Sequence, residues 1–382
     1  MNFIKYAFLF CFVSHLGQSA IAREGPETGV TDSTIKIGMS APLTGSIGAY
    51  GTEMRSVIEL YFQEVNAAGG VNGRTLELVS KDDGYETTRA VENTKQLIEQ
   101  DKVFALTGYY GSSPTIAAME VFSAAKVPLV GAISGSDALR TPVNRYMFHV
   151  RASYANETDQ IIKQLMTIGL TKIGVLYQND GFGKSGLEGI TAAMKKNNLV
   201  PAVVASVERN STDVSAAIKA MSEVKLQAVV LVALYKPVAT FVKQLKEAKL
   251  FPYIATLSPV GADNLVRELN GASRGIMISQ VMPYPSDDTK QVARDYKRLI
   301  EKAGRKGQES YYGIEGYIDA RVLVEGIKLA GRNLTREKLV ASLENMHNFN
   351  VGGFPINYLP TNHNGSQFVE ITILGPGGKL IR

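Results

Sequence analysis

The sequence predicts an α/β fold in which parallel β-sheets are covered on both faces by helices. Short apolar runs, typical of strands buried on both faces, alternate with segments whose apolar residues recur at helical spacing. The alternation occurs twice, and the second series starts near residue 150 with no Pro-, Gly- or Ser-rich linker before it. With 382 residues, 45% hydrophobic and 20% charged, the chain is long enough for two globular units.

The first unit is expected to contain four strands and three helices. Apolar residues alternate over 35–39, as in a strand, and then recur at helical spacing over 54–65 until Gly69-Gly70 ends the helix. The expected strands lie at 35–39, 76–78, 103–106 and 127–130. The expected helices lie at 54–65, at 86–100 and after Pro114.

The second unit repeats this alternation up to residue 282. Its expected strands lie at 172–177, 202–207, 228–234, 253–257 and 275–281. Its expected helices lie at 183–197, 214–221, 238–245 and 262–269. Beyond residue 282 helices are expected at 287–304, 311–331 and 335–344, followed by a short pair of strands around the turn sequence Asn362-His363-Asn364-Gly365.

The N-terminal segment predicts export from the cytoplasm. Lys5 precedes the mostly apolar run Tyr6 to Leu16, and Ala20-Ile21-Ala22 forms an A-x-A cleavage site, so residues 1–22 are expected to be a signal peptide. The single cysteine, Cys11, lies in this leader, so the mature chain depends on its core rather than on disulfides. No later apolar run is long enough to span a membrane, and the basic residues are too scattered to favour nucleic acid.

Small hydroxyl-bearing residues follow two of the expected strands. Ligands of open α/β sheets bind at the carboxyl ends of strands. Ser112 and Ser113 follow the third strand, where Ser113 is expected to cap a helix that begins at Pro114. Ser134 lies in a similar segment, 131–136, after the fourth strand. The segments lack the lysine and glycine spacing of a phosphate loop, so they favour a carboxylate over a triphosphate, although plain helix capping is an alternative.

Two sequence motifs superficially suggest an enzyme. The segment Gly181 to Gly186 matches G-x-G-x-x-G, but three residues separate it from the strand, so a dinucleotide turn would be misplaced. The segment Gly271 to Gly275 matches G-x-S-x-G, but a helix precedes it and a strand follows, the reverse of a nucleophile elbow. The histidines, at 15, 149, 347 and 363, show no metal-ligand spacing. We therefore expect no enzymatic activity, cofactor or metal.

Aromatic residues stand at other strand ends and at one helix start. They are Tyr50, Phe182, Tyr235 and the pair Tyr311-Tyr312. Singly, each is typical of core or surface packing, but together they could wall an apolar ligand.

An ordered series of short motifs resembles the periplasmic leucine/isoleucine/valine-binding proteins that serve ABC importers. The motifs are Ile35 to Met39, Ala41 to Gly45, Ala49 to Gly51, Asn66 to Gly73, Lys81 to Asp83 and Gly111 to Ser113. The resemblance covers essentially the whole mature chain. It implies a monomer with two doubly wound parallel-sheet lobes joined by a hinge that the chain crosses three times. The N-terminal lobe would comprise 30–148 and 283–358, and the C-terminal lobe 149–282 and 359–382.

The resemblance also implies roles for individual residues in a ligand site between the lobes. The Ser112 hydroxyl would bind the ligand α-carboxylate, next to Ser113. The backbone near Ala132 and Ser134 would hold the carboxylate and the ammonium, with help from the Ser134 hydroxyl. The aromatic residues that would line the side-chain pocket are Tyr50, Phe182, Tyr235 and Tyr312.

One position departs from the pattern of this family. Its amino-acid binders place a glutamate after the strand at 253–257, where the carboxylate pairs with the ligand ammonium, but here the position holds Leu257 or Ser258. A buried ammonium without a carboxylate is costly. Either another acid serves, the candidates being Asp83, Asp180 and Glu315, or the ligand has no ammonium.

The sequence thus predicts a periplasmic binding component of an ABC importer, with an inner-membrane permease as its partner. The expected ligand is a small carboxylate-bearing solute: a branched-chain or other apolar amino acid, or a related apolar or aromatic acid. One alternative is a ligand sensor of the same fold that reports to a membrane receptor or regulator. A nucleotide-dependent enzyme is the remaining alternative.

Overall fold

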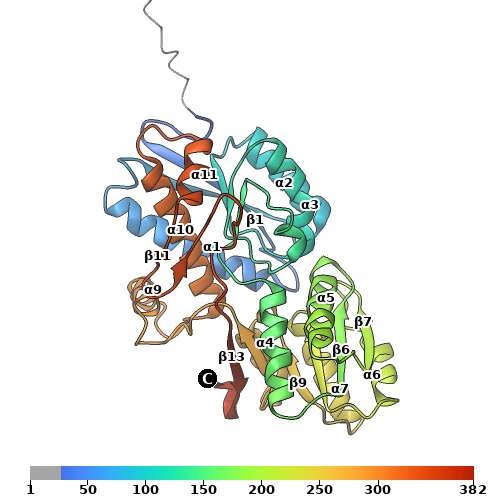
Figure 1. The fold of residues 1–382 in the computed structure, drawn as a ribbon. Coiled ribbons are helices and arrows are strands. Elements are labelled where there is room, and N and C mark those ends of the chain that lie inside the picture. The colour runs from blue at the N-terminus through green and yellow to red at the C-terminus, as the bar shows by residue number, and fades with distance from the viewer. Residues whose placement is uncertain (1–26) are drawn as a thin grey trace, which may run out of the picture.

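The computed structural model describes residues 27–382, which form two bodies, each built on one β-sheet (Figure 1). The predicted signal peptide lies outside the described residues. The first sheet has five parallel strands in the order β2-β1-β3-β4-β5. They are β1 (Thr34–Ala41), β2 (Thr75–Asp82), β3 (Ala105–Thr107), β4 (Leu129–Val130) and β5 (Met147–Phe148).

The helices of the first body come from both ends of the chain. Three follow the early strands: α1 (Gly48–Ala67), α2 (Thr87–Glu99) and α3 (Ser112–Ala124). The others are α9 (Gln291–Lys302), α10 (Tyr311–Ala330) and α11 (Arg336–Glu344). Helix α10 packs against α1, and α2 packs against α3. The buried face of α10 carries Tyr312 and Glu315, so this helix brings late residues to the body formed by the early ones.

The second sheet has seven strands in the order β14-β13-β10-β9-β8-β6-β7. The parallel strands are β6 (Ile173–Gln178), β7 (Val203–Val207), β8 (Ala228–Val232), β9 (Tyr253–Thr256) and β10 (Met277–Gln280). The helices are α4 (Tyr154–Thr167), α5 (Gly181–Lys196), α6 (Ser215–Ser222), α7 (Tyr235–Glu247) and α8 (Ala262–Leu269). The predicted α/β class with two parallel-sheet units is confirmed.

One edge of the second sheet departs from the all-parallel expectation. Strands β13 (Glu370–Leu374) and β14 (Leu380–Ile381) are antiparallel to their neighbours. A short turn at 375–379 joins them, whereas a parallel pair would need a crossover of a dozen residues or more. The prediction that the closing strands turn at Asn362 to Gly365 is therefore wrong.

Residues Asn362 to Gly365 instead lie beside the start of the second body. The His149 N–H donates to the His363 carbonyl at 2.9 Å, and the Gly365 N–H donates to the His149 carbonyl at 2.7 Å. A small hairpin, β11 (Phe349–Asn350) and β12 (Pro355–Ile356), precedes them. The chain passes between the two bodies here, after β5 and after β10.

Helix α4 opens the second body, and no helix was predicted there. Its capping box explains where it begins: Ser153 Oγ accepts the Asn156 N–H at 3.1 Å, and the Asn156 side chain accepts the Ser153 N–H at 3.2 Å. The buried face of α4 includes Glu157 and Thr158 as well as apolar residues. These two polar residues interrupt the apolar periodicity by which a helix is recognised.

Candidate functional site

A cluster of buried aromatic rings lies where the two bodies meet. Tyr50 of α1 lies with its ring centroid 5.4 Å from Tyr110 and 4.4 Å from Tyr312, both of the first body. Tyr235, at the start of α7 in the second body, packs edge-on against Tyr50 at 5.6 Å. The predicted residues Tyr50, Tyr235 and Tyr312 are thus brought together. Tyr110 was missed, although it directly precedes the predicted motif that starts at Gly111.

The hydroxyls of these tyrosines bond to backbone across the boundary between the bodies. Tyr50 donates to the Val260 carbonyl at 2.6 Å, and Tyr312 donates to the Pro259 carbonyl at 2.9 Å. In the other direction, Tyr235 donates to the Ser46 carbonyl at 2.6 Å. The structure therefore shows the two bodies closed on one another.

Two serine hydroxyls form a buried polar pair near this aromatic wall. Ser112 Oγ and Ser134 Oγ share a hydrogen bond at 2.7 Å, and both residues have 0% exposure. The Tyr154 hydroxyl lies 3.3 Å from Ser112 Oγ, and Ala132 is buried in the same loop as Ser134. In residues 27–382 the hydroxyl of buried Ser136 has no hydrogen-bond partner. The two predicted strand ends are thus brought into contact through Ser112 and Ser134.

The start of α3 differs from the prediction. The helix begins at Ser112, and the residue before it, Gly111, has a positive φ of 90°. The Gly111 N–H bonds to the Ile133 carbonyl, which keeps the chain along the neighbouring strand end, and the Gly111 carbonyl accepts the Thr115 N–H. Ser113 is therefore inside the helix and is no cap. Its Oγ instead accepts the Gly181 N–H of the second body at 3.0 Å.

Phe182 is placed by the first turn of α5. Asp180 caps this helix, because its carboxylate accepts the N–H groups of Phe182 at 3.0 Å and Gly183 at 3.1 Å. The Phe182 ring packs against Tyr154 with centroids 5.3 Å apart. A Cβ on Gly183 would lie 1.8 Å from the Gln178 carbonyl oxygen. The glycines of this motif therefore let a helix approach a strand closely.

Of the three candidate ammonium partners, Asp83 and Asp180 are already occupied. Asp83 accepts hydrogen bonds from Ser40 Oγ at 2.9 Å and from the Tyr85 N–H at 2.8 Å, and burial raises its pKa to about 6. Asp180 caps α5 and also accepts from Gln178 Nε2 at 2.8 Å. Neither carboxylate is free to take up a new cation without losing bonds that hold its own loop.

Glu315, the third candidate, is buried on α10 next to Arg151, which was not among the predicted site residues. Glu315 Oε1 lies 3.4 Å from Arg151 Nη1, and across residues 27–382 it accepts no hydrogen bond. Burial raises the pKa of Glu315 to about 7, and the attraction of Arg151 only partly offsets this. The signal that could have revealed Arg151 is a charged residue in the otherwise uncharged segment 146–156 of the predicted boundary between the units.

Glu157 of α4 bonds to Ser258, which stands where the family has a glutamate, and pairs with Arg151. Its carboxylate accepts the Ser258 N–H at 2.8 Å, Ser258 Oγ at 3.0 Å and Ser279 Oγ at 2.6 Å, and it lies 3.5 Å from Arg151. Arg151 also donates to Ser258 Oγ. The predicted contact residue Ser258 is therefore held by an ion pair behind it.

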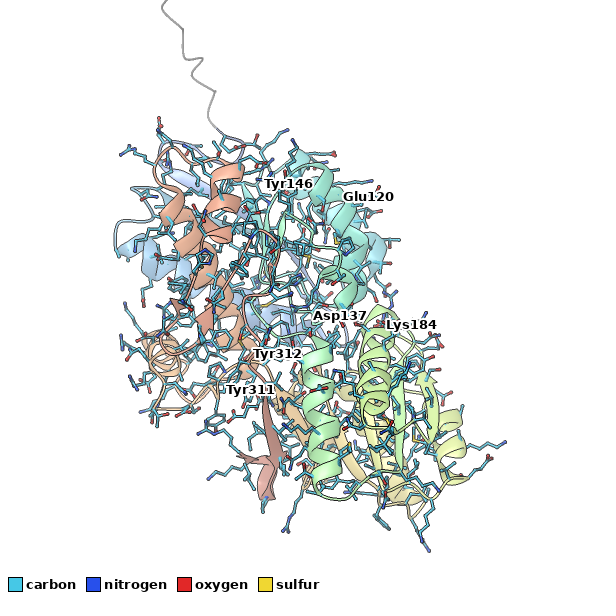
Figure 2. All side chains as sticks on the ribbon, in the orientation of Figure 1. Glu120, Asp137, Tyr146, Lys184, Tyr311 and Tyr312 are labelled. Atoms are coloured by element: carbon cyan, nitrogen blue, oxygen red, sulfur yellow. The ribbon has the colours of Figure 1, made fainter. Side chains whose placement is uncertain are left out.

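A small cavity of about 10 Å³ opens between Ser258 and Glu315. Its lining also includes Tyr311 and Tyr312, which lie where the upper and lower bodies meet (Figure 2). The Tyr311 hydroxyl is buried and has no hydrogen-bond partner within the described part of the chain. The cavity is therefore lined by Glu315, a buried carboxylate whose Oε1 has no hydrogen-bond partner in residues 27–382.

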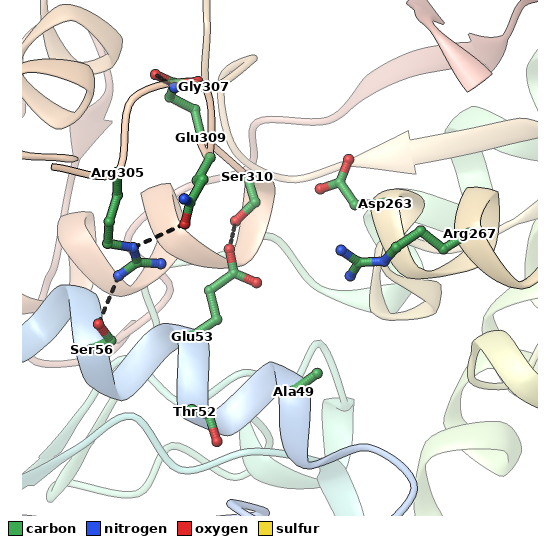
Figure 3. Close-up of a pocket in the computed structure, with 11 residues that line it drawn as sticks. Ala49, Thr52, Glu53, Ser56, Asp263, Arg267, Arg305, Gly307, Glu309 and Ser310 are labelled. Atoms are coloured by element: carbon green, nitrogen blue, oxygen red, sulfur yellow. Dashed lines mark hydrogen bonds between the residues drawn. The ribbon is translucent and has the colours of Figure 1, made fainter. Parts of the chain in front are cut away.

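A larger open groove of about 740 Å³ lies at the outer edge of the same boundary (Figure 3). Arg305 donates to Ser56 Oγ at 2.7 Å, and Ser310 Oγ donates to Glu53. Asp263 and Arg267 of α8 form the opposite wall. The groove is strongly polar, in contrast to the aromatic cluster.

Within residues 27–382 no three His, Cys, Asp or Glu side chains are arranged to hold a metal ion. In the same residues no helix combines the length and the apolar character needed to cross a bilayer.

Comparison with known proteins identifies the fold and the family. A family model described as periplasmic binding protein matches residues 34–378. A structure of a possible leucine/isoleucine/valine-binding protein from Rhodopirellula baltica has a TM-score of 0.86 at 29% identity and covers 92% of this chain and 96% of its own. A substrate-binding periplasmic protein from Ralstonia solanacearum has a TM-score of 0.85 at 32% identity and covers 91% of this chain and 99% of its own.

Among curated proteins, an amino acid binding protein from Pseudomonas aeruginosa is 24% identical over 306 residues, which is 78% of this chain and 79% of that protein. The match of the family model extends over both bodies and all three passages between them. The chain therefore belongs to the periplasmic binding proteins, a family of ligand binders rather than enzymes, as the sequence predicted.

Proposed function

We propose that the chain is the periplasmic substrate-binding component of an ABC importer, and that it captures a small carboxylate-bearing solute between two lobes. The observation that carries this proposal is the pair of buried hydroxyls, Ser112 and Ser134, next to an aromatic wall built from both bodies. The first N–H groups of a helix have no partner within the helix, and α3 begins at Ser112. A carboxylate at this point would receive hydrogen bonds from backbone and hydroxyl donors together.

The two lobes would bind different parts of the ligand, because the proposed contact residues lie on different bodies. The first lobe, residues 30–148 and 283–358, would hold the carboxylate at Ser112 and Ser134. The second lobe, residues 149–282 and 359–382, would close over the ligand with Phe182, Tyr235 and the backbone of 259–260. The bonds that cross the boundary stabilise the closed form, so a ligand that contacts both lobes shifts the population toward it.

The ligand class and the partner are extensions of the family assignment. The relatives from Pseudomonas aeruginosa and Rhodopirellula baltica are named for binding amino acids, and for leucine, isoleucine and valine. The aromatic wall around Tyr50 suits an apolar ligand side chain of the size of leucine, isoleucine or valine. We therefore place branched-chain and other apolar amino acids first, and related apolar acids second. Cleavage after residue 22 would release a monomer that docks on an inner-membrane permease.

A thermal-shift panel tests this function. Residues 23–382 are purified, unfolded and refolded to remove any bound solute, and then heated with a reporter dye. The panel contains aliphatic amino acids, aromatic acids, short amides and NAD. A true ligand at 100-fold over its Kd stabilises the protein by about 2.7 kcal/mol, which for this size means a shift of roughly 2 °C or more. A shift with NAD and with no carboxylate-bearing apolar solute would overturn the proposal.

A further inference from the structure

We propose that Glu315 binds the ammonium group of the ligand, and that the ligand class is therefore the α-amino acids rather than carboxylic acids without an ammonium. This inference rests on the proposed function. It extends that function by naming the carboxylate that pairs with the ligand ammonium, since position 258 holds a serine rather than the glutamate of the family.

The first step is the cavity that Ser258 and Glu315 share. At about 10 Å³ it holds roughly one water-sized group, which is also the size of an ammonium. Glu315 has 4% exposure, and its Oε1 accepts no hydrogen bond from residues 27–382. Tyr311, one turn earlier on α10, also lines the cavity. An ammonium placed here would donate to a carboxylate oxygen that otherwise has no hydrogen-bond partner in residues 27–382.

The second step compares the acids near this cavity. Glu157 already accepts three hydrogen bonds and pairs with Arg151, so its acceptor sites are used. Arg151 is therefore shared by two carboxylates, and one negative charge is in excess. When both carboxylates are ionised, Glu315 holds that excess, because Arg151 lies 3.4 Å from it without a hydrogen bond. A second cation is what the cluster lacks.

The third step concerns the opposite end of the ligand. Arg140 is buried at 5% exposure and donates to the Ser134 carbonyl at 3.2 Å, so a positive charge lies next to the Ser112–Ser134 pair. Among the residues the structure describes, no carboxylate lies within 4 Å of this guanidinium. A buried positive charge therefore lies at Ser134, and a buried carboxylate lies beside Ser258. A zwitterion complements both, whereas a simple carboxylic acid complements only one.

If Glu315 binds the ligand ammonium, binding should also change the protonation of Glu315. The charged and titratable groups that act on it are Arg151, Glu157, Asp319 and Tyr312, and Tyr311 lines the same cavity. Burial and the nearby Glu315 raise the pKa of Asp319 well above its usual range. With its pKa raised to about 7, Glu315 is partly protonated near neutral pH. An ammonium beside it favours the carboxylate, so binding should release a proton below pH 7.

The test compares matched ligand pairs by isothermal titration calorimetry on refolded residues 23–382. The pairs are leucine with 4-methylpentanoate, valine with 3-methylbutanoate, and phenylalanine with 3-phenylpropanoate. We expect the wild type to bind at least one amino acid about 100-fold or more tightly than its partner acid, because the acid leaves Glu315 uncompensated. Glu315→Gln should weaken amino-acid binding about 10- to 100-fold and leave the partner acid unchanged or tighter. Binding of amino acids and their partner acids with equal affinity would overturn the inference.

Two controls keep the result interpretable. Glu53→Gln removes a carboxylate in the outer groove whose pKa is also raised by burial, and it should leave all affinities within about twofold. The wild type alone supplies the second readout: titration of the amino acid at pH 6 in two buffers of different ionisation enthalpy should show proton release, even if Glu315→Gln does not fold. No proton release, or tighter binding of the partner acids, would overturn this inference while the proposed function stands. Failure of all six ligands would overturn both.

Discussion

Ser112 would donate the main side-chain hydrogen bond to the ligand carboxylate. It lies at the first turn of α3, fully buried, and it is in contact with both Ser134 and the Tyr154 hydroxyl. Ser112→Ala should weaken carboxylate binding by about 1–3 kcal/mol, because a buried charged oxygen loses one of its donors. Calorimetry with the best ligand of the panel measures this change. Ser222→Ala, at the exposed end of α6, is the matched control, and a loss of only a few tenths for Ser112→Ala would remove Ser112 from the site.

Glu315 also predicts how the ligand-free stability depends on pH. Its pKa is about 7 when folded, against 4.5 for the free side chain, so the folded chain binds this proton more tightly than the unfolded chain. The stabilisation is fully present below pH 4.5 and is lost as pH rises to about 7. Relative to Glu315→Gln, the wild type should therefore lose free energy of unfolding, about 3 kcal/mol at most, between pH 4.5 and 8. Urea unfolding at three pH values tests this, and a constant difference would contradict it.

At the scale of single residues, the structure brings some of the predicted residues into contact. Tyr50 lies against Tyr312, and Ser112 bonds to Ser134, while their role in binding stays a prediction. The ion pair of Arg151 with Glu157 could not be predicted, because it joins residues that only the tertiary fold brings together with Ser258 and Ser279.

The loop 258–261 is the element through which the second body meets the tyrosines. Gly261 has a positive φ of 70°, and a Cβ there would lie 2.7 Å from the Tyr50 ring and 3.0 Å from the Tyr312 ring. Gly261→Ala should therefore hinder closure and weaken ligand binding about tenfold, mainly through faster dissociation. Stopped-flow dissociation kinetics measure the change.

Gly271→Ala provides the matched control for this loop. Gly271 has a positive φ of 85°, but a Cβ there would meet nothing within 4 Å. The backbone strain is comparable while the contact with the tyrosines is missing. Equal effects of the two substitutions on dissociation would show that strain, and not closure, is responsible.

Elements with a plain apolar pattern were predicted well, and elements with mixed patterns were not. The runs that became β3 and β8 are buried throughout, and their assignment as strands was confirmed. Helix α4 was missed because its buried face carries Glu157, which serves the charge cluster rather than the core. The start of α3 was misplaced because Gly111 keeps its bond to Ile133, a contact between distant segments that local capping rules do not see.

At the scale of the whole molecule, closure should be visible as an approach of α3 and α5. These helices belong to different bodies and are in contact through Ser113 and Gly181. Glu120 and Lys184 lie exposed on them (Figure 2), and the predicted mature chain has no cysteine, so Glu120→Cys with Lys184→Cys allows specific labelling with a dye pair. Energy transfer should rise when ligand is added to stripped protein. An unchanged signal at saturation would contradict hinge closure.

The same labelled protein tests whether the loop 258–261 controls closure of the two bodies. If closure depends on the loop 258–261, Gly261→Ala in the labelled chain should need more ligand to reach the same energy transfer, whereas Gly271→Ala should not. Partly exposed pairs such as Arg209 with Glu86 also cross the boundary, at 2.8 Å, and water screens them in part. Closure is therefore expected to be insensitive to moderate salt.

The most direct measurement is a crystal structure of residues 23–382 with the tightest ligand of the thermal-shift panel. We expect the ligand carboxylate within hydrogen-bond distance of the hydroxyls of Ser112 and Ser134, and its apolar part against Tyr50 between the two bodies. A ligand bound in the outer groove of Glu53 and Arg305, or one that leaves both serine hydroxyls bonded only to protein, would contradict the proposed site.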